Sequence, residues 1–92
     1  MTPPDPARLF EHGQQAAGVI AAKHRGDLAG AEALLAGFPD DQARLQGFCL
    51  LAELALSLVR AQTGQSMDDL VQELTLHMAG AALRPPPGTA AA

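Results

Sequence analysis

The chain contains three histidines. Imidazole is the side chain that proteins use most often for metal binding and for proton transfer near neutral pH. His12 and His24 fall in one predicted helix, about 120° apart around its axis, so they do not share a face. Glu73 and His77 have the one-turn spacing of half a metal site, but no second pair has ligand spacing. We therefore interpret the histidines as packing or surface residues and predict no metal and no cofactor.

Cysteine and paired carboxylates offer the other candidate chemistry. Cys49 is the single cysteine, which excludes an internal disulfide and a cysteine-based zinc site, and no basic residue lies one turn away to activate the thiol. We predict that Cys49 fills the core. The pairs Asp40–Asp41 and Asp68–Asp69 stand at predicted helix starts, where capping accounts for them. No catalytic residue is predicted, and the protein is expected not to be an enzyme.

The composition indicates one all-α domain. The chain has 92 residues, of which 48% are hydrophobic, without Trp or Tyr. Ala and Leu, which are strong helix formers, dominate, while Val and Ile are few. We expect an orthogonal or bundle-like array of four helices around one long central helix. Residues 1–5 are expected to be flexible, residues 6–84 to form the single domain, and residues 85–92 to be a disordered Pro/Ala tail.

The charge balance narrows the possible partners. A net charge of −4 argues against binding to nucleic acid or to an anionic membrane. The basic cluster Lys23–His24–Arg25 is explained by the last turn of a helix, although recognition of phosphate or an acidic partner is the alternative. The most apolar run, residues 48–59, is too short to span a bilayer, and the start of the chain lacks a secretory pattern. A cytoplasmic location is expected.

Capping signals divide the chain into four helices, which run from Pro6 to about Arg25, from the Asp27 cap to about Ala36, from Asp40 or Asp41 to Thr63, and from Ser66 to about Leu83. Apolar periodicity then predicts one inner face for each of the three shorter helices. In the first helix this face comprises Leu9, Gly13, Ala16, Ala17, Ile20 and His24. In the second it comprises Leu28, Ala31, Leu34 and Leu35, followed by Phe38. In the last it comprises Leu70, Val71, Leu74, His77, Met78 and Ala81.

The central helix, 41–63, is apolar around most of its circumference. Its polar residues gather on one narrow stripe, Gln42, Gln46, Glu53, Ser57 and Arg60. At 1.5 Å per residue the central helix is roughly 33 Å long, whereas helix 28–36 is only about 15 Å long. A short link connects helix 28–36 to the start of the central helix, so it can cover only the first half of that helix. We therefore predict an uncovered interface at Leu51, Leu54, Leu58 and Val59. The alternative is that the first helix or the tail covers this flank.

Three functions remain open from these features. The first is a non-enzymatic protein–protein interaction domain that forms a homodimer through the central helix. The second is an adaptor or regulatory subunit for a different protein. The third is a small-molecule binder or enzyme with a pocket between helices near His77 and Cys49.

Two segments carry a resemblance. Residues 26–35 read Gly-Asp-Leu-Ala-Gly-Ala-Glu-Ala-Leu-Leu, and residues 63–74 read Thr-Gly-Gln-Ser-Met-Asp-Asp-Leu-Val-Gln-Glu-Leu. With the Leu/Ala helix between them, the chain resembles small all-helical proteins of high-GC actinobacteria. Residues 26–35 also resemble one hairpin of a tetratricopeptide-type unit, without a repeat. These resemblances imply a helical fold and bring no catalytic residues with them.

Overall fold

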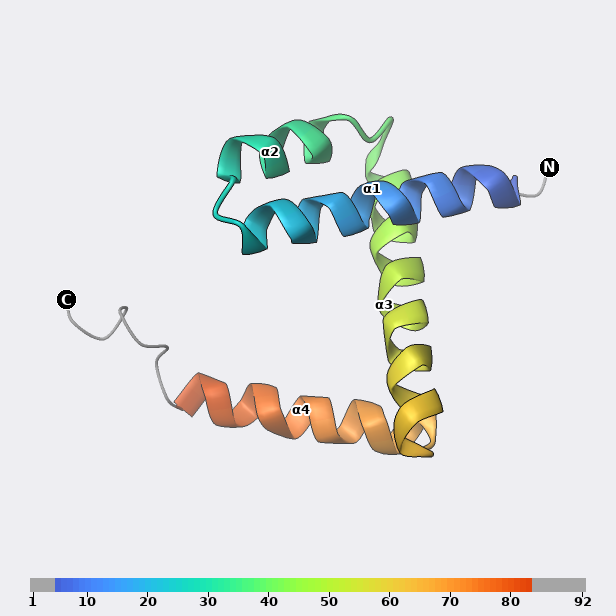
Figure 1. The fold of residues 1–92 in the computed structure, drawn as a ribbon, viewed down its shortest axis with the longest axis vertical. Helices are drawn as coiled ribbons and strands as arrows, with labels where there is room; N and C mark the ends of the chain where they lie inside the picture. Colours follow the sequence, from blue (N-terminus) through green and yellow to red (C-terminus); the bar gives the residue numbers. More distant parts are fainter. Residues whose placement is uncertain (1–4, 84–92) are drawn as a thin grey trace. The chain divides into compact units, whose positions relative to one another are not determined.

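The computed structural model describes residues 5–83 and is built from four helices, with no strand among those residues. They are α1 (Pro6–His24), α2 (Leu28–Ala36), α3 (Asp41–Thr63) and α4 (Met67–Leu83), and α3 is the longest (Figure 1). The predicted all-α class is therefore confirmed. The predicted Pro/Ala tail, residues 85–92, lies outside the described residues. Contacts divide the chain into two compact units at Ala55, which we call unit 1 (to Ala55) and unit 2 (from Leu56).

A polar side chain precedes each helix and accepts a hydrogen bond from an amide of its first turn. The four capping side chains are Asp5, Asp27, Asp40 and Ser66, with donor–acceptor distances of 3.0, 2.9, 2.7 and 3.1 Å. The first amides of a helix have no partner within the helix, so these caps satisfy donors that would otherwise be left open. The local sequence thereby determines where the helices begin.

Removal of the α2 cap gives a direct measure of this effect. Asp27→Ala deletes the acceptor of the Gly30 amide and is expected to lower the free energy of unfolding by about 1 kcal/mol in urea denaturation. Glu32→Ala is the matched control, because it removes an exposed acidic side chain from the same helix without removing a cap. Equal losses in the two variants would contradict the capping role of Asp27.

The turn between α1 and α2 makes these two helices neighbours. Gly26 has a φ of 80°, a left-handed conformation that glycine adopts without strain. Its amide donates to the Lys23 carbonyl at 3.0 Å, and the Asp27 amide donates to the Ala22 carbonyl at 2.9 Å, which is the Schellman ending of a helix. The chain reverses here, and α1 and α2 lie side by side (Figure 1). The Gln15 side chain joins them by donating to the Leu34 carbonyl at 2.7 Å.

The core of unit 1 consists of two small clusters. One contains Ala16, Phe38 and Ala43, and the other contains Val19, Ala22 and Ala31. Leu35 and Phe48 pack against both clusters and connect them. Most of these side chains are small, so the helix backbones approach each other closely. The core is therefore densely packed although it contains few large side chains.

Two predicted inner faces are corrected by this core. In α1, Val19 is buried and Ile20 is exposed, so the inner face is rotated by one residue from the prediction. In α2, Ala31 is buried while Leu28 and Leu34 are exposed. The physical reason is the same in both helices. Where two helices pack most closely, small side chains lie between them because they allow the backbones to come near each other. The larger neighbours Ile20 and Leu28 therefore point outward.

The crossing of α1 and α3 depends on glycine. A Cβ atom added to Gly47 would lie 2.5 Å from the His12 carbonyl oxygen and 2.9 Å from the His12 carbonyl carbon. A Cβ atom on the facing Gly13 would lie 3.2 Å from Leu50 Cδ2. The backbone of α3 therefore rests almost directly on the backbone of α1 at this point.

Unit 2 is packed very differently. Gly64, with a φ of 75°, ends α3, and its amide donates to the Arg60 carbonyl at 2.8 Å. Of the predicted inner face of α4, only Leu70 is buried, and every described residue from Val71 onward is exposed. The prediction that these residues form a buried inner face is therefore wrong beyond Leu70.

Candidate functional site

The three histidines lie on separate parts of the structure. The His12 ring packs near the Phe38 ring, with 6.2 Å between the centroids, whereas His24 and His77 are exposed. Within residues 5–83 no group of three or more His, Cys, Asp or Glu side chains could hold a metal ion. The described part of the chain thus offers no metal centre from which a reaction could be argued.

Cys49 is exposed, so the prediction that it fills the core is wrong. It lies on α3 about 180° around the helix axis from Leu58. The apolar residues on either side of Cys49 in the sequence made burial the simplest expectation. Unit 1, however, uses only one side of α3, at Ala43 and Gly47, and Cys49 is on another.

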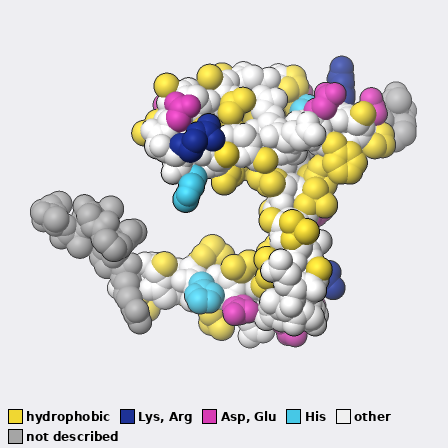
Figure 2. Space-filling model, in the orientation of Figure 1, with side chains coloured by type: hydrophobic (Ala, Val, Ile, Leu, Met, Phe, Trp, Pro, Cys, Tyr) yellow, Lys and Arg dark blue, Asp and Glu magenta, His cyan; other side chains and the backbone are white. Residues whose placement is uncertain are grey.

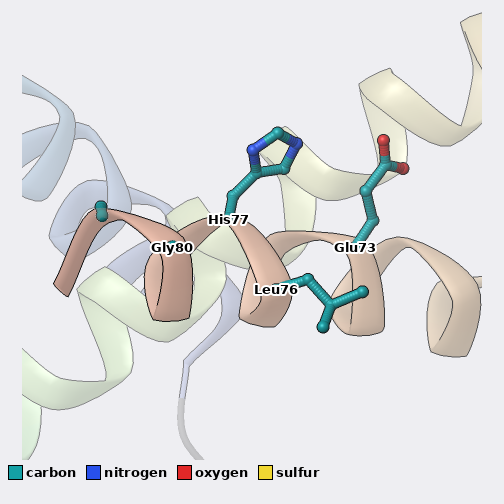
Figure 3. Close-up of a pocket in the computed structure, with 5 residues that line it drawn as sticks. Glu73, Leu76, His77 and Gly80 are labelled. Atoms are coloured by element: carbon teal, nitrogen blue, oxygen red, sulfur yellow. The ribbon is translucent and has the colours of Figure 1, made fainter. Parts of the chain in front are cut away.

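A depression of about 490 Å³ lies along α4. Its lining residues are Glu73, Leu76, His77, Gly80 and Ala81. Glu73 and His77 point to the same side of the helix, and Leu76 points away from them (Figure 3). One carboxylate oxygen of Glu73 accepts a hydrogen bond from the Gln65 side chain at 2.8 Å.

This depression does not match the predicted pocket. All of its lining residues come from a single helix, whereas small-molecule sites enclose most of the ligand surface between several elements. Cys49 is not among its lining residues.

The four predicted interface residues of α3 have different environments. Leu51 is half-buried and packs against the core cluster that contains Ala16 and Phe38. Leu54, Leu58 and Val59 are exposed, and Leu58 has an exposed fraction of 69%. We call these three exposed residues the α3 patch.

Leu54 and Leu58, but not Val59, continue the face that α3 uses in unit 1. Leu54 and Leu58 fall within about 20° of Gly47 around the helix axis, because they follow it by nearly whole numbers of turns. At Gly47 this face is covered by α1, whereas at Leu54 and Leu58 it is exposed. An apolar helix face that is covered at one end and open at the other indicates a surface with room for a further helix.

A second apolar surface runs along α4. Six residues recur at three- or four-residue spacing on one side of this helix, and we call them the α4 stripe: Leu70, Val71, Leu74, Met78, Ala81 and Ala82. Hydrophobic side chains are visible along the surface of α4 (Figure 2). Apart from Leu70, every member of the α4 stripe is exposed.

The chain matches no known protein-family model, no curated protein and no solved structure at a significant level. Function must therefore be argued from the surfaces themselves. None of the helices within residues 5–83 has both the length and the hydropathy needed to cross a membrane.

The sequence interpretation identified the α3 patch but missed the exposed part of the α4 stripe. Val71, Leu74 and Met78 were assigned to a covered face, because an amphipathic helix usually turns its apolar side toward its own domain. One signal was available in the sequence. The acidic side chains of α4, namely Asp68, Asp69 and Glu73, all lie in its first two turns, so the second half of the helix has almost no polar side to face water.

Proposed function

We propose that this protein is a helical interaction domain that associates with a second copy of itself through the α3 patch. The observation that carries the proposal is the exposure of Leu54, Leu58 and Val59 on one helix, next to a face that is already used for helix packing. Contiguous apolar surface on a soluble domain is characteristic of protein interfaces. Burial of one Leu or Val side chain contributes about 1.5–3 kcal/mol to the stability of such a complex.

The small core of unit 1 supports the same proposal. A chain of this length buries a modest fraction of its surface, and association is a common way to increase it. In the described residues the largest fully buried side chain is that of Val19. Large apolar side chains are left exposed on all four helices, among them Leu54, Leu58 and Val59 on α3.

Leu58→Asp tests the function by placing a charge in the α3 patch. We expect this variant to weaken self-association by about 100-fold, because it removes roughly 2–3 kcal/mol of apolar burial and adds a carboxylate that must be desolvated. The measurement is sedimentation equilibrium over a range of micromolar concentrations. Leu45→Asp is the matched control, since Leu45 lies on the same helix, has a similar exposed fraction of 64%, and points about 140° away from Leu58.

Two results would contradict the proposal. The first is a wild-type chain that remains a strict monomer at high micromolar concentration. If this monomer co-purifies from its native cell with a stoichiometric partner, the adaptor function replaces self-association. The second is equal weakening by Leu45→Asp and Leu58→Asp, which would show that the α3 patch has no special role.

A further inference from the structure

We infer that the α4 stripe is occupied by α4 of a second copy of this chain, and that the two α4 helices run antiparallel. The inference rests on the proposed function, since it assumes self-association, and it names the segment and the direction of pairing. It follows from three properties of α4: its exposure, its distribution of charge, and its gradient of side-chain size.

The exposure of α4 requires a partner of some kind. Isolated helices of this length are marginal in water, and most helix stability in proteins comes from packing of an apolar face. Only Leu70 supplies such packing within the described residues. Val71, Leu74 and Met78 present large apolar side chains that an additional helix would cover.

The charges of α4 favour antiparallel pairing with its own copy. Asp68, Asp69 and Glu73 lie in the first two turns, and residues 74–83 contain no Asp, Glu, Lys or Arg. Parallel pairing would place two acidic clusters next to each other. Antiparallel pairing centred near residue 76 separates their mean positions by about 18 Å along the axis. This distance exceeds the Debye length of about 8 Å at physiological ionic strength, so the repulsion is largely screened.

The gradient of side-chain size along α4 also favours antiparallel pairing. The first half of the α4 stripe carries Leu70, Val71 and Leu74, and the last turn carries Ala81 and Ala82. An antiparallel pair centred near residue 76 places Val71 opposite Ala81 of the second copy, and Leu74 opposite Met78. At each end the large residues Leu70 and Val71 then face the small residues Ala82 and Ala81, and Leu74 meets Met78 near the centre, which allows close packing at both ends. A parallel pair would place large against large at one end and leave a gap at the other.

The surface is self-complementary in the sense that a two-fold axis demands. Each α4 helix carries large side chains in its first half and small ones in its last turn. The contact between a large half and a small half therefore occurs twice, related by the two-fold axis. A different protein could match the α4 stripe only with a surface whose side-chain size and charge change along its length in the complementary way. A second copy of α4 provides both without further assumptions.

Disulfide cross-linking distinguishes the two directions. In a Cys49→Ser background, Val71→Cys and Ala81→Cys chains are prepared separately, mixed, and oxidised with diamide. Antiparallel pairing predicts a cross-linked dimer in the mixture and none in Val71→Cys alone, whose two thiols would be about 15 Å apart along the axis. A disulfide requires Cα atoms within about 7 Å. Parallel pairing predicts a cross-linked dimer already in Val71→Cys alone, because residue 71 then faces residue 71 of the second copy.

A charge substitution tests the same stripe without any cross-link. Met78 and Leu76 have the same exposed fraction, 65%, but point about 160° apart around α4. We expect Met78→Asp to weaken the dimer by about 100-fold or more and Leu76→Asp to change it by less than about threefold. Circular dichroism at high concentration establishes that both variants remain folded.

The outcomes separate this inference from the proposed function. A monomeric wild-type chain overturns both. A dimer that cross-links through Val71→Cys alone, or that shows neither cross-link and tolerates Met78→Asp, overturns the antiparallel α4 pair and leaves association through the α3 patch intact. A cross-link in the mixture alone, together with dissociation by Met78→Asp, supports the inference.

Discussion

Replacement of Phe38 by alanine is expected to lower the free energy of unfolding by about 3–5 kcal/mol. Phe38 is only 5% exposed, and its ring centroid lies 6.2 Å from those of both His12 and Phe48. The substitution leaves a cavity where the residue after α2 meets α1 and α3. Small domains have only about 5–15 kcal/mol of total stability, so much of unit 1 should be unfolded at physiological temperature.

The measurement is urea denaturation followed by far-UV circular dichroism, with Phe10→Ala as the matched control. Phe10 is 54% exposed and belongs to neither core cluster, so its loss should cost less than about 1 kcal/mol. A Phe38→Ala variant as stable as Phe10→Ala would show that the Phe38 cluster is not the core of unit 1.

Gly47→Ala is expected to have the second-largest effect on the free energy of unfolding. It should destabilise the protein, although helix propensity alone predicts that alanine stabilises it. Alanine in the interior of a helix is normally favoured over glycine by roughly 0.5–1 kcal/mol. At Gly47 the new methyl group would meet the carbonyl group of His12, which is backbone and cannot rotate away. The helices must separate, and we expect a net loss of about 2–3 kcal/mol in the free energy of unfolding.

Gly80→Ala provides the control for that experiment. A Cβ atom at Gly80 meets no atom within 4 Å, and Gly80 is not part of the α4 stripe. This variant should therefore be stabilised by roughly 0.5–1 kcal/mol. The contrast between the two positions is measured by thermal unfolding under identical conditions. Stabilisation by both substitutions would contradict the close backbone contact between α1 and α3.

The ends of the helices could be predicted from the sequence because they depend on local chemistry. Asp5, Asp27 and Ser66 act on amides two or three residues away, and Gly26 and Gly64 supply backbone conformations that other residues adopt at a cost. Nothing distant is needed for these effects. The observed helix bounds therefore lie close to the predicted ones.

The inner faces were less predictable because they depend on the neighbour. Val19 and Ile20 are both apolar and differ by about 100° around α1, so periodicity alone does not choose between them. The choice comes from the closest contact, which is made by Gly13 on α1 and Gly47 on α3. Cys49 was misplaced for the same reason, since only the direction of α1 decides which side of α3 becomes the inside.

The exposure of the proposed interface residues could be predicted only in part. The difference in length between α2 and α3 pointed to Leu54, Leu58 and Val59, and these residues are exposed. Leu51 was assigned to the same surface but packs against the core. The α4 stripe could not be predicted as open, because its exposure depends on the direction in which the chain leaves Gly64.

The single buried residue of α4 has a consequence for the order of folding. In unit 1 the packing of α1 on α2 joins segments that are close in sequence, through the turn at Gly26, and local contacts of this kind form quickly and without a partner. In the described part of α4, Leu70 is the one buried residue. On the proposed pairing, its final ordering is a bimolecular event, so the rate at which this protein completes its folding is set by how many copies surround it.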